Sequence, residues 1–310
     1  MLTRLAHTYS IVAHDPETNQ LGVAVQSHYF AVGPVVPWAE AGVGAVATQS
    51  FVEVSYGPLG LAMMRAGKSA EEALQGLLAS DPRVDVRQVA MVDIHGNVAA
   101  HTGQKCIQAA GHRTGAGYSA QANLMLNDTV WGAMAEAYEG AEGDLAERLM
   151  VALEAAEAEG GDIRGKQSAA LLVVTGTPTG KPWADKLFDL RVDDHPEPLP
   201  ELRRILSIAR AYRLSDEAET ALVTGSQNEE TIADEYRRAF EMMPDSSNPE
   251  IAYWQAVALT NSGKLDEALP IFAKVFAADP HWRDLTPRLV PAGLLVDDEE
   301  AIRRIVELER

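Results

Sequence analysis

A threonine at the head of the first predicted strand has the clearest chemical potential in this sequence. Thr8 opens "TYSIVAHD", which reads as a β-strand, and seven residues precede it. Threonine is a good strand former, so the position has a purely structural interpretation. The chemical interpretation is that a threonine freed at a chain terminus acts as a nucleophile, because its own α-amine, with a pKa of roughly 8, serves as base. The sequence makes Thr8 the candidate nucleophile of amide hydrolysis.

Other polar side chains gather at the ends of later predicted strands. Attack on an amide needs hydrogen-bond donors for the oxyanion, and Asn123 or backbone N–H groups near Gln49 are the candidates. Asp162 and Ser168 complete the predicted catalytic set, and with Arg164 they would position Thr8 or the substrate. The Arg164 fork suits a substrate carboxylate. The predicted substrate-binding residues are His28, Gln49, Ser50, His101, Arg113, Arg164 and Gln167.

These polar residues also have structural explanations. A lone strand histidine is usually a satisfied structural group, and this applies to His28, His101 and His112. The stretch "GGDIRG" could be only a helix end followed by an Asx turn. The stretch "DDH" before the prolines lacks the spacing of a known metal motif such as H-E-x-x-H. The sequence therefore predicts neither a metal nor another cofactor.

Composition narrows the classes of partner. The chain has 310 residues, a formal net charge of −19 and one cysteine, Cys106. Such a negative field does not attract nucleic acid or an anionic membrane, and a single cysteine cannot form an internal disulfide. The opening "MLTRLAH" has no apolar core of a signal peptide, and no run approaches the roughly 18 apolar residues of a spanning helix. The expected compartment is the cytoplasm, and the expected ligand is a small molecule.

The predicted elements before residue 195 mix strands and helices. Strands are expected at 9–15, 21–30, 42–50 and 167–176, a hairpin at 86–103, and helix pairs at 55–81 and 127–161. Ser69 and Glu72 form a capping box at the second helix. This order favours a sandwich of sheets with helices outside over alternating βαβ units. Neither G-x-G-x-x-G nor a Walker A loop supports nucleotide binding.

The chain changes character near residue 200. Pro196, Pro198 and Pro200 predict a stiff linker at 196–200, outside any helix, and the sequence beyond it is entirely helical. Residues 249–280 fit the tetratricopeptide pattern, while an upstream copy at Ile232, Tyr236, Ala239 and Pro244 is partial. The region 201–310 is expected to bind a protein partner or to self-associate as a homo-oligomer, with a generic helical array and a passive appendage as the alternatives.

Five long segments together resemble the domain of unknown function 1028 family. They begin with "TYSIVAHDPETNQLGVAVQSHYFAVG" and include "VDIHGNVAAHTG", "AGHRTGAGYSAQANLML" and "GGDIRGKQSAALLVV", and the resemblance extends from Thr8 to Leu206. It implies a fold of the N-terminal nucleophile hydrolase-like superfamily, a four-layer αββα sandwich, for residues 1–195. Members often start Met-Thr, so Thr8 matches a residue that methionine removal would expose.

The seven residues before Thr8 depart from that family pattern. Three interpretations stay open: the chain is cleaved between His7 and Thr8, the added segment keeps the site inactive, or the chemistry needs no free α-amine. The expected function is an amidohydrolase for a small amide, with a carboxylate-bearing amide as one candidate substrate. The alternative is a non-catalytic ligand-binding or scaffold protein of the same fold with a helical interaction module.

Overall fold

A computed structural model describes residues 5–6, 8–243 and 248–308 of the chain. The chain divides into two compact units, Met1–Arg203 and Arg204–Arg310. Across the described residues, no helical stretch combines the length and the apolar character that a bilayer crossing requires.

The first unit contains two antiparallel sheets. The β5 sheet has the order β1-β5-β6-β7, with β4 also paired to β5: β1 (Leu5–Ala6), β4 (Pro37–Glu40), β5 (Gly44–Phe51), β6 (Arg87–Asp93) and β7 (Val98–Thr102). The β2 sheet has the order β11-β10-β3-β2-β9-β8: β2 (Thr8–His14), β3 (Leu21–Ser27), β8 (Gly111–Gly115), β9 (Tyr118–Ala122), β10 (Ser168–Val174) and β11 (Lys186–Val192). Every pairing within the two sheets is antiparallel.

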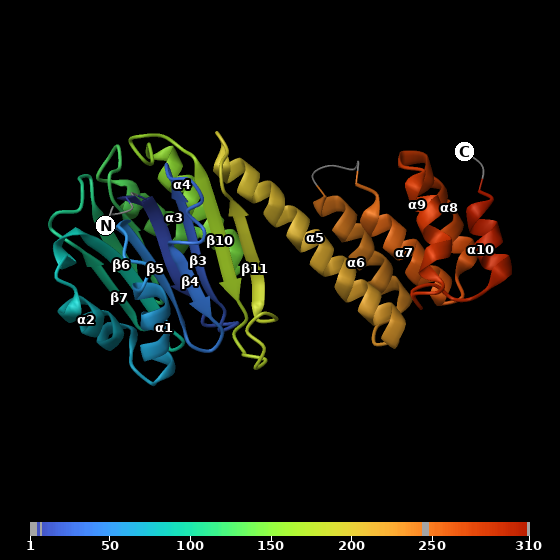
Figure 1. Cartoon of the computed structure of the whole chain (residues 1–310), viewed down its shortest axis with the longest axis horizontal. Helices are drawn as coiled ribbons and strands as arrows, with labels where there is room; N and C mark the ends of the chain where they lie inside the picture. Colours follow the sequence, from blue (N-terminus) through green and yellow to red (C-terminus); the bar gives the residue numbers. More distant parts are fainter. Residues whose placement is uncertain (1–4, 7, 244–247, 309–310) are drawn as a thin grey trace. The chain divides into compact units, whose positions relative to one another are not determined.

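The two sheets face each other, and each is covered on its outer side by a pair of helices (Figure 1). Helices α1 (Tyr56–Arg65) and α2 (Ala70–Ser80) lie on the β5 sheet, while α3 (Val130–Gly140) and α4 (Leu145–Ala158) lie on the β2 sheet. Small and branched side chains fill the space between the sheets, among them Val25, Ala47 and Leu172. The prediction of a mixed α+β fold is confirmed.

Local sequence signals account for the helix starts. The side chain of Ser69 accepts a hydrogen bond from Glu72 N, and the Glu72 side chain accepts one from Ser69 N, as the capping-box pattern predicts. Helix α4 begins in the same way, because Asp144 Oδ1 accepts from Glu147 N at 2.8 Å. These caps satisfy N–H groups that the first helical turn leaves without partners.

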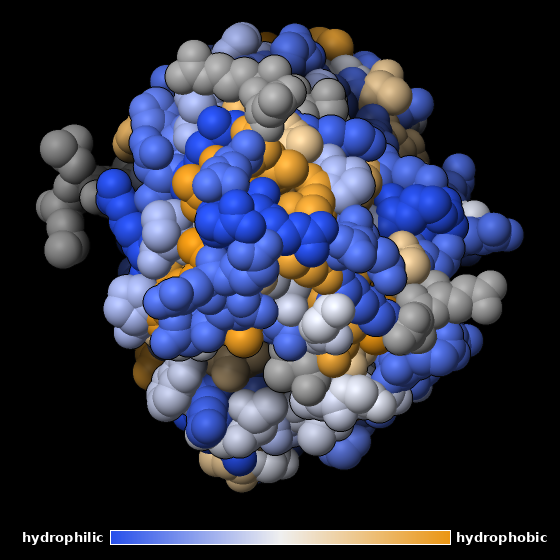
Figure 2. All heavy atoms as spheres, turned by 90° about the vertical axis from the view of Figure 1, so that its right-hand side faces the viewer, coloured by the Kyte–Doolittle hydropathy of each residue, from blue (hydrophilic) through white to orange (hydrophobic). Residues whose placement is uncertain are grey.

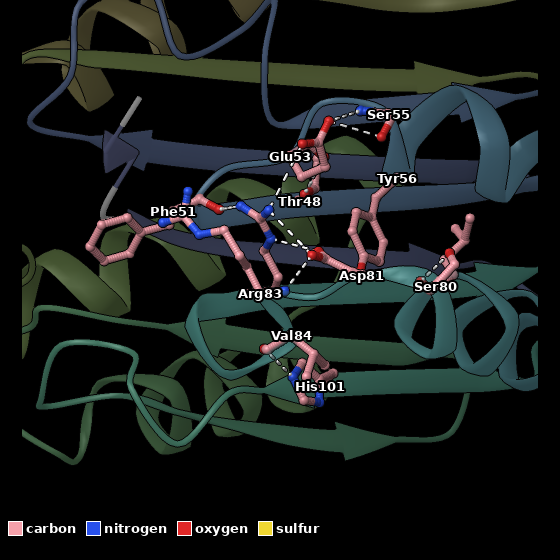
Figure 3. A network of polar contacts seen from close by, with 12 residues as sticks. Thr48, Phe51, Glu53, Ser55, Tyr56, Ser80, Asp81, Arg83, Val84 and His101 are labelled. Carbon is pink, nitrogen blue, oxygen red and sulfur yellow. Dashed lines mark hydrogen bonds and ion pairs between the residues drawn. The ribbon is translucent and has the colours of Figure 1, made fainter. Parts of the chain in front are cut away.

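A buried ion pair connects the end of β5 with helices α1 and α2 (Figure 3). The side chain of Arg87, at the start of β6, is 6% exposed, and its Nε donates to Asp81 Oδ2 at 2.7 Å. Asp81 also accepts hydrogen bonds from Tyr56 OH and Arg83 N, while Arg87 Nη1 donates to the carbonyl of Phe51. One guanidinium thus connects the last residue of β5, the first residue of α1 and the residue after α2.

The prediction that the prolines at 196–200 lie outside any helix holds for Pro196 and is wrong for Pro198 and Pro200. Helix α5 runs from Pro198 to Thr224, so Pro198 and Pro200 occupy its first turn. The first N–H groups of a helix have no partner inside it, so a proline there removes no hydrogen bond. Leu202 in the same helix is fully buried.

Helices make up the second unit, as the sequence predicts. After α5 come α6 (Glu229–Met242), α7 (Glu250–Asn261), α8 (Leu265–Ala278), α9 (His281–Leu285), a 3₁₀ turn (Thr286–Leu289) and α10 (Glu299–Val306). Gly263, between α7 and α8, has a φ of +77°, which residues with a side chain rarely adopt. Tyr253 from α7 and Phe272 from α8 lie at the centre of an apolar cluster between these helices.

The upstream helical copy is partly visible. Ile232, Tyr236 and Ala239 are buried in α6, whereas Pro244 lies outside the described residues. The surface in Figure 2 is mostly hydrophilic, with hydrophobic residues gathered in bands between the charged ones. The expected role of this unit in partner binding or self-association stays a prediction.

Candidate active site

Three hydroxyl side chains line up at one end of the β2 sheet. The strand register places Thr8 opposite Ser27, and Ser27 opposite Ser168, so the three come from adjacent strands β2, β3 and β10. All three residues are fully buried. Side chains alternate along a strand, and Ser10, two residues after Thr8, donates to Gln49 in the opposite sheet. The hydroxyl of Thr8 therefore lies on the face toward the space between the sheets.

Both sheets hold Thr8 in place. Its Oγ1 donates to Ser27 Oγ at 3.1 Å. Its carbonyl oxygen accepts hydrogen bonds from Asn123 N at 3.1 Å and from Gln49 Nε2 at 3.1 Å, with Asn123 Nδ2 at 3.4 Å. The main chain at the candidate nucleophile is thus fixed by residues from β5 and from the end of β9.

Gln88 organises the amide side chains beside Thr8, and sequence analysis missed it. Its Oε1 accepts from Gln49 Nε2 at 2.7 Å and from Asn123 Nδ2 at 2.8 Å. Its Nε2 donates to Thr102 Oγ1 and to the carbonyls of Gly111 and Ala122. The signal was available: Gln88 alternates with inward-facing Ala90 and Val92 in β6, and a buried carboxamide is costly unless it is hydrogen-bonded.

This network has a consequence for Asn123, the predicted oxyanion donor. Asn123 Nδ2 donates hydrogen bonds within the protein to Gln88 Oε1 at 2.8 Å and, at 3.4 Å, to Thr8 O. Asn123 therefore positions the main chain of Thr8 in this state of the chain.

Asp162 and Arg164 form an ion pair near the site, in which the carboxylate is buried and the Arg164 side chain is 30% exposed. Arg164 Nε donates to Asp162 Oδ1 at 3.0 Å and Nη2 to Oδ2 at 2.6 Å, and the Asp162 side chain is fully buried. Asp162 Oδ2 also accepts from the main-chain N–H of His28, the residue after Ser27. The bidentate edge of Arg164, which suggested a substrate carboxylate, is thus engaged by Asp162.

Ser168 braces the loop that follows β3. Its Oγ donates to Tyr29 O at 2.5 Å and accepts from Val32 N at 3.1 Å. Gln167 N donates to Ser27 O, but its side chain donates to Asp194 at the surface. The structure thus brings Ser168 and the exposed His28 to the Thr8 end of the sheet, while the Gln167 side chain is directed to solvent.

Three predicted binding residues do not reach Thr8. Ser50 follows Gln49, so its side chain takes the opposite face of β5, beside the Cys106 thiol. His101 alternates with Thr102 in the same way, and its Nε2 lies 3.0 Å from Val84 O. Arg113 pairs with Glu136 and Glu139 of α3 on the outer side.

His112 lies at the end of the hydrogen-bond network that is centred on Gln88. The Thr102 hydroxyl, which accepts from Gln88, lies 2.8 Å from His112 Nδ1. Burial lowers the pKa of His112, with a further contribution from His101. The chain of bonds runs from His112 through Thr102 and Gln88 to Asn123. Within the described part of the chain, His, Cys, Asp and Glu side chains form no group of three or more suited to a metal ion.

The fold and the site define a class: a two-sheet α+β protein with outer helix pairs and a buried threonine at the head of a central strand. Residues 8–202 match the model of the "Family of unknown function (DUF1028)", and the chain belongs to this family. A crystal structure of a Silicibacter pomeroyi protein of the same family is 33% identical, with a TM-score of 0.59 over 65% of this chain and 85% of the other. No curated protein matches the chain. The matched region begins at Thr8.

Proposed function

We propose that the first unit is an amidohydrolase of the N-terminal nucleophile type, with Thr8 as its nucleophile. The observation that carries this proposal is the position of Thr8, where a fully buried hydroxyl at a strand head faces the space between two sheets. The family match starts at the same residue. The order of layers, from helix pair through two antiparallel sheets to helix pair, agrees with the αββα sandwich of that superfamily.

The proposed reaction begins with hydrolysis of the bond between His7 and Thr8, which frees the α-amine of Thr8. This amine takes the proton of Oγ1 as the oxygen attacks the substrate carbonyl. The tetrahedral intermediate then loses the amine half, which leaves with that proton, and an ester of Thr8 remains. Water hydrolyses the ester, releases the acid and restores the threonine.

The surrounding residues have distinct roles in this proposal. Ser27 Oγ accepts from Thr8 Oγ1 and orients it, and Gln49 holds the Thr8 carbonyl. The 3.4 Å contact between Asn123 Nδ2 and Thr8 O is the weakest bond of the group. A charged oxyanion is a stronger acceptor than a carbonyl, so Asn123 can turn to the intermediate. Asp162 and Ser168 keep the loops around Thr8 in place.

The test of this function is the chain terminus of the purified protein. We expect intact-protein mass spectrometry to find a species that begins at Thr8, and we expect amide turnover to rise in proportion to that species. The reason is that a main-chain amide nitrogen is not basic, so only a terminal Thr8 carries its own base. An intact terminus with no turnover across a panel of amides would instead support the non-catalytic ligand-binding or scaffold protein.

For the second unit we propose a tetratricopeptide-like pair of α7 and α8 that serves self-association. A groove of about 400 Å³ beside this pair is lined by apolar side chains that include Phe240, Ile271 and Val275, and Phe240 is 40% exposed. Exposed apolar surface of this kind favours association. We expect sedimentation velocity of the full chain to show a dimer that Phe240→Ser weakens. A monomer at every concentration would contradict self-association.

A further inference from the structure

An apolar rim of four side chains lies on the loops at the Thr8 end of the first unit. The rim consists of Ile107, Leu124, Leu126 and Ile163. Ile107, Leu126 and Ile163 are 39%, 55% and 56% exposed, unusually high for large aliphatic side chains. Hydrogen bonds join their loops directly, because Leu124 N donates to Ile107 O at 2.8 Å and Ile163 N donates to Leu124 O at 3.2 Å.

The local pairing puts the rim residues on one face. Met125 and Asp162 form an antiparallel bridge, and both are buried. Neighbours along an extended chain point to opposite sides. Leu126 and Ile163, each next to a bridge residue, therefore lie on the outer side of the bridge, where both are exposed. The main-chain hydrogen bonds of Leu124 to Ile107 and Ile163 place it beside them.

The rim borders the candidate site. Asn123, whose N–H donates to Thr8 O, immediately precedes Leu124. Asp162, which accepts from His28 N, immediately precedes Ile163. The rim is thus one residue away, on two separate loops, from a group that contacts Thr8 and from one that contacts His28, the residue after the strand partner Ser27.

The backbone at Leu124 is held in an unfavourable conformation. Its φ is +60°, in the left-handed region that costs a leucine about 1 kcal/mol or more. Bonds at both its N–H and its carbonyl keep it there. Such conformations gather at ligand sites, where the surrounding structure enforces them.

The charges at the site do not favour an anionic substrate. The Arg164 fork is engaged by Asp162, so this pair is electrically neutral as a unit. The chain as a whole carries a formal charge of −19, which repels anions at long range. An apolar group that covers exposed aliphatic side chains, in contrast, lowers the free energy, because apolar surface is removed from water.

We propose that the Thr8 site takes a neutral amide with a bulky apolar acyl group, and that the apolar rim binds this group. The inference rests on the proposed function of Thr8 for the reaction, but the binding can be measured without it. Alkyl or aryl acyl groups fit this description, whereas acetyl groups are too small to reach the rim.

The experiment uses the full chain with Thr8→Ala, so that no ligand is consumed, and measures binding of acetyl and hexanoyl p-nitroanilide by saturation-transfer NMR. We expect the hexanoyl compound to bind at least about tenfold more tightly, since a buried CH₂ contributes about 0.8 kcal/mol and the rim covers only part of the chain. Ile163→Ser and Ile107→Ser should each weaken binding of the hexanoyl compound about fivefold and leave binding of the acetyl compound unchanged. Leu59→Ser is the matched control, because Leu59 is 50% exposed on α1, away from the rim.

The outcomes separate the two proposals. Equal binding of both compounds, or tighter binding of hexanoate than of the hexanoyl amide, overturns the apolar-rim inference even if the wild-type chain turns over amides. Chain-length dependence without turnover by a chain that begins at Thr8 supports the rim and contradicts the hydrolase. Circular dichroism checks the fold of each variant, and Leu126→Ser gives an independent measurement if Ile163→Ser does not fold.

Discussion

Replacing Thr8 with alanine is expected to lower kcat for amide hydrolysis by about 10⁴-fold or more, because no other group replaces a lost nucleophile. Thr8→Ser keeps a hydroxyl and the α-amine and should retain activity within about a hundredfold. The assay is the release of p-nitroaniline by protein whose terminus at Thr8 has been confirmed by mass spectrometry.

The matched control for this variant is Ser10→Ala. Ser10 lies two residues further along β2 on the same inner face, is fully buried, and donates to Gln49 Oε1 at 2.6 Å. Its loss removes two hydrogen bonds of the same network, one to Gln49 Oε1 and one from Gln121 Nε2, without touching the nucleophile. We expect a loss of stability of about 2 kcal/mol and nearly unchanged kcat. Full turnover by Thr8→Ala would show that the nucleophile is another residue, whatever the fold.

Replacing Arg87 with alanine is expected to lower the free energy of unfolding by about 3–5 kcal/mol, because it leaves the buried Asp81 carboxylate without its partner. Arg65→Ala is the matched control. Arg65 pairs with the Glu40 carboxylate, but its side chain is 56% exposed, and surface pairs contribute about 0–1 kcal/mol. Urea unfolding followed by circular dichroism measures both. Equal losses for the two variants would contradict a buried pair at Arg87.

Acid provides a second check on this ion pair. Burial raises the pKa of the Asp81 carboxyl, but hydrogen bonds from Arg87 and from Arg83 N outweigh it, so the net pKa is lowered. A lowered pKa in the folded state gives stability that is present above the unfolded value of about 3.9 and is lost as pH falls through the folded value. The difference in stability between wild type and Arg87→Ala should therefore shrink below about pH 4.

Local sequence patterns predicted the parts of the fold that depend on neighbours in the chain. The capping box of Ser69 and Glu72 involves residues three apart, and the glycine between α7 and α8 ends a helix by its own backbone freedom. The linker prediction failed because proline disrupts the interior of a helix but is tolerated in its first turn. Pro198 lies in the first turn of α5.

The candidate site depends on register, which no local pattern contains. Sequence analysis singled out Thr8, Asn123 and Ser168, and the structure brings these to one end of the sheet. The roles of Ser27 and Gln88 follow only from pairing between strands far apart in the sequence. The position of Ser50 shows the same limit, because a shift of one residue along a strand reverses the face.

The described residues before Thr8 belong to one sheet, and the strand that begins at Thr8 belongs to the other. Leu5 and Ala6 pair with Phe51 and Ser50 in the β5 sheet, while β2 starts at Thr8 in the other sheet. While the chain is intact, the segment is tethered to the first unit. Its effective concentration beside β5 is therefore high, which favours this short pairing. Cleavage before Thr8 would turn the segment into a separate peptide. The two residue pairs formed by its described residues, Leu5 and Ala6, are by themselves too few to offset the several kcal/mol that association costs.

The released peptide would diffuse away and would not return, so activation of the threonine would be a one-way event that each molecule undergoes once.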